Sequence, residues 1–198
     1  MCVGDSCAFG APIHRHRHRQ ALHRAPHRHT RHRHAAGHHG CANARLRPTW
    51  QDLSLIRAAT LCLINRERVT RNEAPLRPNA RLGRAAQGHS ESMSADDYFE
   101  HYGPEGQTPL SRMRAAGYIS SSRVGFEVGE NIAWGTRRLA TPRAIVAAWM
   151  ASPEHRANIL NANYRETGIG VTPQPPASLA EGQPGAIYTQ DFGVIIGP

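Results

Sequence analysis

The feature that most constrains this 198-residue chain is a change in composition near residue 49. Ten of its thirteen histidines lie between His14 and His39, interleaved with arginine and with few large apolar side chains. Such a segment cannot bury enough apolar surface to offset the entropy lost on ordering. We therefore expect a disordered, low-complexity His/Arg-rich tail over residues 1–48. Residues 49–198 are long enough to form one folded domain with its own core.

The tail carries most of the excess positive charge. Seven arginines and one acid, Asp5, precede residue 44, so the basic character of the whole chain says little about the partner of the domain. Clustered imidazoles can bind zinc, nickel or copper, and Arg/His runs can attract nucleic acid or anionic membranes. We keep metal and nucleic-acid binding as alternatives for the tail, but favour an incidental solvated segment.

The positions of the cysteines and the lengths of the apolar stretches bear on the cellular location of the protein. Three of the four cysteines, Cys2, Cys7 and Cys41, lie in the tail, so the pattern does not predict a disulfide framework. Cys62, between leucines, is expected to be a small buried apolar residue. No stretch of about 18 apolar residues predicts a membrane-spanning helix. The N-terminus also lacks the apolar run of about 7 to 15 residues that marks a secretory signal.

Residue periodicity predicts a mixed α and β domain. A helix is expected from about Asp52, where apolar residues recur at helical spacing, and Asn79 can cap a second. A short helix is expected over Leu110 to Ala116, and Thr141-Pro142 and Ser152-Pro153 are typical of two further helix starts. Alternating or apolar runs predict strands at Val128 to Trp134, Glu166 to Thr172 and Ala186 to Ile196. This order favours helices flanking a small antiparallel sheet.

Only three histidines follow the tail, and each has a distinct expected place. His89 falls on the inward face of the second helix, where it is either a packed core residue or part of a cleft. His101 lies on a loop interrupted by glycine and proline. His155 falls in the first turn of the helix that Ser152-Pro153 begins.

Seven motifs occur in one order across about Leu53 to Gly193, and together they resemble the bacterial branch of the CAP superfamily. This family comprises the cysteine-rich secretory proteins, antigen 5 and the pathogenesis-related proteins, and its domain is also called the SCP domain. The motifs are Leu63-Ile-Asn-Arg-Glu-Arg68, Ala86-Gln-Gly-His-Ser-Glu-Ser-Met93, Phe99-Glu-His101, Gly129-Glu-Asn-Ile-Ala-Trp-Gly135, Trp149-Met-Ala-Ser-Pro-Glu-His-Arg-Ala-Asn-Ile-Leu160, Gly168-Ile-Gly-Val171 and Tyr188-Thr-Gln-Asp-Phe-Gly193.

The resemblance implies an α-β-α sandwich with a cleft that holds two histidines and two acids. His101 and His155 match the two histidines, and Glu130 matches the acid of the Gly-Glu-Asn motif. The second acid is expected three residues after Trp149, where this chain has Ser152. Glu166 is a possible substitute, and His89 is a neighbour that could supplement the cleft.

Two chemistries are open to these groups. His101, His155 and Glu130 could hold a divalent metal such as zinc with an open position for water, as in a metal-assisted hydrolase or protease. Without a metal, Glu130 could fix the tautomer of an imidazole that acts as a base. A purely structural cluster is the third possibility. Ser90 and Ser152 lie near histidines in sequence, but that spacing does not establish a nucleophile.

We favour a binding module over an enzyme. The family resemblance implies an extracellular or cell-envelope location and a lipid, sterol, cell-wall or other small ligand, and we expect a monomer. The metal-assisted hydrolase is kept as the alternative function of the same cleft.

Overall fold

The computed structural model describes residues 40–197. The expected disorder of the tail up to residue 39, and its suggested metal or nucleic-acid binding, therefore lie outside the described residues. Residues 40–48, which the composition assigns to the tail, lie against the domain. Ala44 is buried, and Leu46 packs against the main core.

The expected helices and strands are all present. The helices are α1 (Leu53–Val69), α2 (Ala80–Ala95), α3 (Pro109–Ala115), α4 (Pro142–Ala151), α5 (Pro153–Leu160) and α6 (Ala177–Ala180), with a 3₁₀ helix η1 (Arg137–Ala140). The strands are β1 (Arg77–Pro78), β2 (Gly125–Thr136), β3 (Glu166–Thr172) and β4 (Gly185–Ile196). Asn79 and Thr141 cap α2 and α4 as expected, because their side chains accept backbone N–H groups of the first turn.

The strands form one sheet in the order β1-β3-β4-β2. The β3/β4 and β4/β2 pairs are antiparallel, as expected, whereas the two-residue β1 joins β3 in parallel. Strand β2 is therefore an edge strand. Its register with β4 places Glu130 directly opposite Asp191, so both side chains point to the same face of the sheet.

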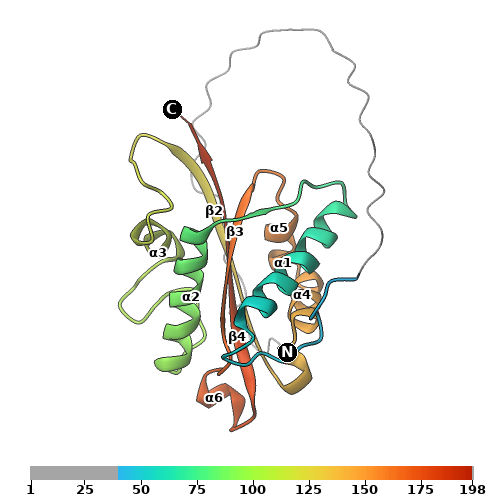
Figure 1. The fold of residues 1–198 in the computed structure, drawn as a ribbon. Helices are drawn as coiled ribbons and strands as arrows, with labels where there is room; N and C mark the ends of the chain where they lie inside the picture. Colours follow the sequence, from blue (N-terminus) through green and yellow to red (C-terminus); the bar gives the residue numbers. More distant parts are fainter. Residues whose placement is uncertain (1–39, 198) are drawn as a thin grey trace.

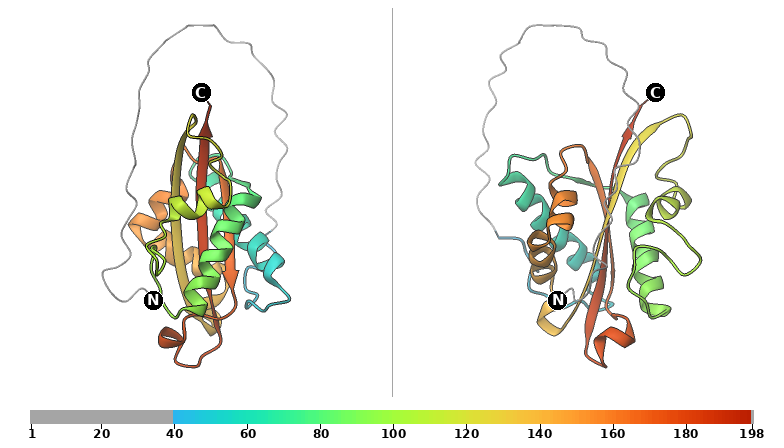
Figure 2. Two further views of the ribbon diagram at one scale, coloured as in Figure 1. Left: turned by 90° about the vertical axis from the view of Figure 1, so that its left-hand side faces the viewer. Right: turned by 180° about the vertical axis from the view of Figure 1, so that it is seen from behind.

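Helices cover both faces of this sheet. Figures 1 and 2 show α2 and α3 on one face and α1, α4 and α5 on the other, which confirms the expected α-β-α sandwich. Helix α2 lies close to β3 because Gly168 and Gly170 lack a Cβ atom. A Cβ at Gly168 would collide with the backbone of α2 at Leu82 and Gly83, and one at Gly170 with Ala86.

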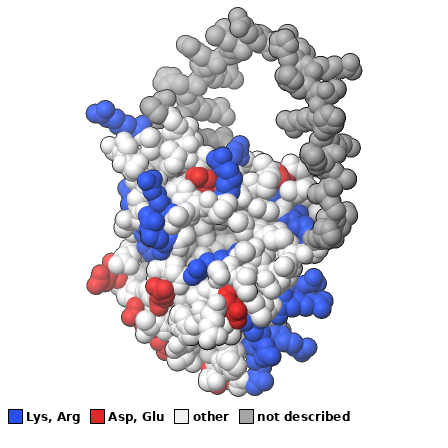
Figure 3. Space-filling model, viewed as in Figure 1, with Lys and Arg blue, Asp and Glu red and all other residues white. Residues whose placement is uncertain are grey.

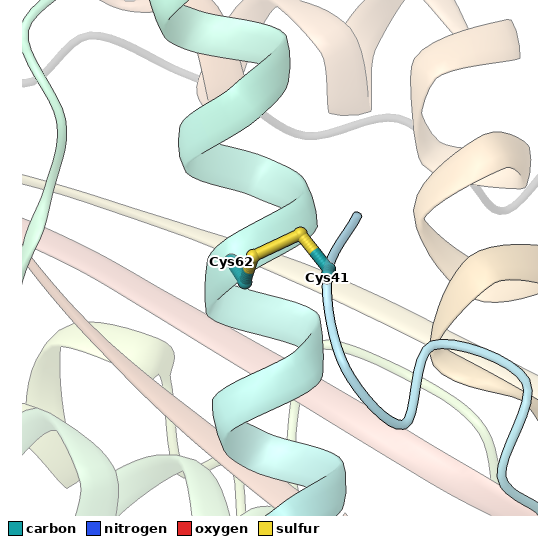
Figure 4. The surroundings of a disulfide bond; sticks show 2 residues. All are labelled: Cys41 and Cys62. Atoms are coloured by element: carbon teal, nitrogen blue, oxygen red, sulfur yellow. A yellow bond between two sulfur atoms is a disulfide. The ribbon is translucent and has the colours of Figure 1, made fainter. Parts of the chain in front are cut away.

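A disulfide joins Cys41 to Cys62 (Figure 4). The expectation that Cys62 is a buried free thiol is therefore wrong, as is the placing of Cys41 in a tail separate from the domain. Cys62 is exposed on α1, next to the buried Leu63. Its apolar neighbours in the sequence therefore gave a wrong indication that its own side chain is buried. The bond attaches the segment at residues 40–48 to α1.

We expect this disulfide to contribute about 3 kcal/mol to the free energy of unfolding, because it closes a loop with a sequence separation of 21 residues. Urea unfolding should show this loss when the protein is reduced. The double variant Cys41→Ser/Cys62→Ser is the control, since reductant should not destabilise it further. An equal effect of reductant on both proteins would contradict the assignment.

Candidate functional site

Glu130, in the middle of β2, is the centre of a buried polar cluster. Its side chain is 2% exposed. Its Oε1 atom lies 2.7 Å from His101 Nδ1, and its Oε2 atom lies 2.7 Å from Arg112 Nη2. His89 Nε2 lies 3.9 Å from the same Oε1 atom. We call these four residues, together with Asp191, the Glu130 cluster.

Arg112 fixes the loop that carries His101. It lies in α3, whose N-terminus is held by a capping box between Thr108 and Ser111. One guanidinium nitrogen, Nη2, donates to the His101 carbonyl as well as to Glu130, and Nη1 donates to the Gln107 carbonyl. The His101 Nδ1–H donates to Glu130, so the ring's Nε2 is the atom left free of the carboxylate.

His89 is both a core residue and a member of the cluster. It is 1% exposed, and its Nε2 atom lies 2.9 Å from the Glu100 carbonyl, to which it donates. Burial lowers the pKa of His89 to about 4, with a smaller contribution from the charge of Arg112. The imidazole is therefore neutral at neutral pH.

The two facing carboxyl groups differ in ionisation. Burial alone would raise the pKa of Glu130, but the hydrogen bond from His101 and the charge of Arg112 hold it below its ordinary value. Burial and the charge of Glu130 raise the pKa of Asp191 well above its ordinary value. Asp191 is fully buried, and neither of its carboxyl oxygens has a hydrogen-bond partner among residues 40–197. Within this pair the charged form is therefore favoured at Glu130 and the protonated form at Asp191.

His155 comes from a different helical layer than His89 and His101, although it lies close enough to His101 for the two imidazoles to interact electrostatically. It lies in α5, in the helical layer opposite α2 and α3 (Figure 2). Its Nδ1 atom lies 2.8 Å from Ser152 Oγ, and its carbonyl accepts from Asn131 Nδ2. Burial, and to a lesser extent the charge of His101, lower the pKa of His155 to about 4. No hydrogen bond within residues 40–197 joins its ring to the Glu130 cluster.

The amide of the Gly-Glu-Asn motif is structural. Asn131 is fully buried, and its Oδ1 atom accepts from Asn158 Nδ2, which also donates to the Glu130 carbonyl. These bonds attach β2 to α5. Glu130 has a different role from its neighbour, because its carboxylate contacts side chains of the opposite layer.

Ser152 does not complete a serine-histidine-acid triad. Its Oγ atom contacts His155 Nδ1 and lies 3.2 Å from Glu154 Oε2. The acid thus contacts the serine and not the histidine. In a triad the acid orients the imidazole, which then takes the proton of the nucleophile.

Glu166 is not the fourth member of the cluster. Its carboxylate accepts hydrogen bonds from Tyr118 Oη at 3.0 Å and Asn79 Nδ2 at 3.1 Å, which ties β3 to the start of α2. The acid that lies opposite Glu130 is Asp191, through the register of β2 with β4. Asp191 is marked in the sequence as the single acid inside an otherwise uncharged buried strand. Arg112 has no comparable signal, because it lies on a short helix beside a second arginine, Arg114.

The predicted metal ligands do not fit a metal centre. Both carboxylate oxygens of Glu130 already accept from His101 and Arg112, and a cationic guanidinium opposes a second cation there. Within the described part of the chain, no three His, Cys, Asp or Glu side chains are arranged to hold a metal ion.

A groove of about 650 Å³ lies between α2 and α3, beside the Glu130 cluster. Among the four predicted cleft residues, only His89 lines it, together with Arg112. The remaining lining residues are small or polar: Arg84, Ala85, Gly88, Ser92, Gln107, Ser111, Ala115 and Ala116. The groove thus meets the cluster at His89 and Arg112.

We expect Asp191→Asn to change the free energy of unfolding at pH 7 by less than about 1 kcal/mol, because an amide has nearly the shape of the neutral carboxyl. Glu130→Gln should cost about 3 kcal/mol or more, since it leaves the Arg112 charge buried without its partner. Urea unfolding of both variants tests the assignment. Equal losses would show that Asp191 is the charged member.

We expect the neutral forms of His89 and His155 to make stability depend on pH. The pKa of each is about 4 in the folded protein, against an ordinary value of 6.5. Their contribution is present above about pH 6.5 and is lost as the pH falls towards 4, by up to about 1.4 kcal/mol per pH unit for each group.

The measurement is urea unfolding of the wild type, His89→Gln and His155→Asn between pH 4 and pH 7. Each variant should have a shallower dependence than the wild type over this interval. The slope of each variant is compared with that of the wild type, because the raised pKa of Asp191 changes the pH dependence of all three proteins in the opposite direction. Identical slopes would contradict the prediction.

Comparisons with known proteins agree with this fold and these motifs. The sequence profile of the cysteine-rich secretory protein family, CAP, matches residues 61–192. The protein YkwD of Bacillus subtilis is 34% identical over 130 residues, which are 66% of this chain and 44% of YkwD. The membrane protein YlbC of the same organism is 32% identical over 112 residues, 56% of this chain and 30% of YlbC. The chain thus spans less than half the length of these curated relatives.

Solved structures show the same architecture. An extracellular protein of Bacillus anthracis that contains an SCP domain superposes with a TM-score of 0.56 at 27% identity, covering 73% of this chain and 43% of that protein. An outer surface protein of Borrelia burgdorferi has the same TM-score at 18% identity, covering 74% and 94%, which shows a shared fold. With its layers, its motifs and two thirds of its length matched, this chain belongs to the CAP family of cysteine-rich secretory proteins.

Proposed function

We propose that the protein is a binding module that acts outside the cytoplasm and takes a lipid, cell-wall or other small ligand in the groove between α2 and α3. The observation that carries this proposal is the sharing of His89 and Arg112 between the groove and the Glu130 cluster. A ligand in the groove would contact side chains whose positions are fixed by a buried charge. Such pre-organisation reduces the entropic cost of binding.

The groove offers both apolar and polar contacts. Ala85, Gly88 and Ala115 present little side-chain bulk, so the two helices leave room between them. Arg112 is 10% exposed, and its buried Nε–H has no partner among the described residues. Ligand pockets commonly combine apolar walls with a few placed polar groups.

The disulfide supports a location outside the cytoplasm, because such bonds persist in oxidising compartments. The related Bacillus anthracis protein is described as extracellular, which supports the same location. Between residues 40 and 197, no helix has both the length and the apolar character needed to cross a bilayer.

We propose binding rather than catalysis because the central carboxylate is fully engaged by His101 and Arg112. A metal-assisted hydrolase stays a prediction of the sequence, and the arrangement of His101, Glu130 and His155 does not favour it.

Filling the groove should abolish binding. A Cβ atom at Gly88 would have no heavy atom within 4 Å, so Gly88→Leu can be accommodated on α2 and should project into the groove. We expect at least tenfold weaker binding of whichever probe the wild type binds in calorimetric titrations with soluble peptidoglycan fragments and with a fluorescent fatty acid.

The matched control is Gly83→Leu, because Gly83 lies on the same helix with equally open space and does not line the groove. Both variants replace a helical glycine and should be similarly stabilised, by up to about 1 kcal/mol. Equal affinity in the two variants, or no binding of any probe by the wild type, would contradict the proposal.

A further inference from the structure

We propose that a second surface of this protein, rich in arginine, docks on an anionic lipid membrane. Figure 3 shows basic side chains gathered at the lower right, over η1, the start of α4 and the segment at residues 40–48. We call this the arginine surface. Its residues are Arg45, Arg47, Arg137, Arg138 and Arg143, all of which are exposed.

Backbone contacts hold these residues together. The Ala44 carbonyl accepts from the Arg143 backbone N–H at 2.8 Å, which sets Arg45 beside the start of α4. Helix η1 folds back onto the end of β2 because Gly135 has no side chain, since a Cβ there would lie 2.5 Å from the Leu139 carbonyl oxygen. The disulfide between Cys41 and Cys62 anchors the segment that carries Arg45 and Arg47.

The positive charge of this surface is not neutralised within the domain. None of the five arginines forms an ion pair among residues 40–197. Four of them, Arg45, Arg47, Arg138 and Arg143, also have no side-chain hydrogen bond there, and only Arg137 donates one, to Gln183. Clustered cations without partners attract a negatively charged surface.

An exposed apolar side chain favours a membrane over a dissolved polyanion as the partner of this surface. Leu139 is 54% exposed and directly follows Arg137 and Arg138 in η1. A dissolved polyanion would leave this side chain in water, whereas the interface of a bilayer accepts both guanidinium groups and an apolar side chain. The residues before residue 44 add positive charge to the chain, since they include seven arginines and one acid.

Docking through this surface leaves the proposed ligand groove accessible. The segment at residues 40–48 packs on the layer of α1 and α4, whereas the groove lies between α2 and α3 on the opposite face of the sheet (Figure 2). The inference therefore does not depend on what the groove binds.

The test is sedimentation of the full chain with vesicles of phosphatidylcholine alone and of phosphatidylcholine mixed with phosphatidylglycerol. We expect binding only to the mixed vesicles, weakened by added salt. Each arginine near an anionic surface contributes about fivefold to the partition coefficient. The variant Arg45→Gln/Arg47→Gln/Arg138→Gln/Arg143→Gln should therefore bind at least about 100-fold more weakly.

A second quadruple variant controls for total charge and for the residues before residue 40. Arg66→Gln/Arg77→Gln/Arg81→Gln/Arg123→Gln removes the same charge from other exposed arginines that also lack side-chain hydrogen bonds within the described residues, and it should lose much less affinity. Equal losses in the two variants would overturn the proposal, as would no binding of the wild type to mixed vesicles.

Leu139→Ser distinguishes a membrane from a dissolved polyanion. Loss of a buried leucine contact should weaken vesicle binding by about tenfold without changing binding to inorganic polyphosphate. If the variant binds mixed vesicles as tightly as the wild type, the surface recognises negative charge alone and the membrane proposal is wrong.

Discussion

The buried charge of Glu130 is the constraint on which the site depends. A carboxylate that is 2% exposed is tolerated only because Arg112 and His101 reach it, and reaching it fixes their own positions. Arg112 must in turn bring α3 and the loop before it against β2. The same charge raises the pKa of Asp191, whereas the pKa of His89 is lowered by burial against the attraction of Glu130.

Local signals predicted most of the fold. The capping residues Asn79 and Thr141 and the proline after each helix start depend on the first turn alone, so short-range reasoning locates them. The contacts of Arg112, Asp191 and Cys41 depend instead on residues far away in sequence. Cys62 is an example of what local signals cannot predict, because its apolar neighbours in the sequence do not indicate that the segment at residues 40–48 packs beside it.

The arrangement of the candidate site could not be read from the sequence for a topological reason. His101 and His155 both carry family motifs, but they come from opposite sides of the edge strand β2, His101 from the loop before α3 and His155 from α5 (Figure 2). Sequence order cannot tell on which face of a sheet a helix packs. The same ambiguity hid Asp191, which meets Glu130 only through the pairing of β2 with β4.

The disulfide connects the location of the protein with its shape. In a reducing compartment the segment at residues 40–48 would lose its covalent link and keep the packing of Cys41, Ala44 and Leu46 on the core and the hydrogen bond from the Arg143 backbone N–H. Outside the cell the bond fixes that segment on α1 and, with it, two of the five side chains of the arginine surface. An oxidising environment would thus complete the surface proposed to dock on a membrane, while the Glu130 cluster, built without sulfur, is the same in either compartment.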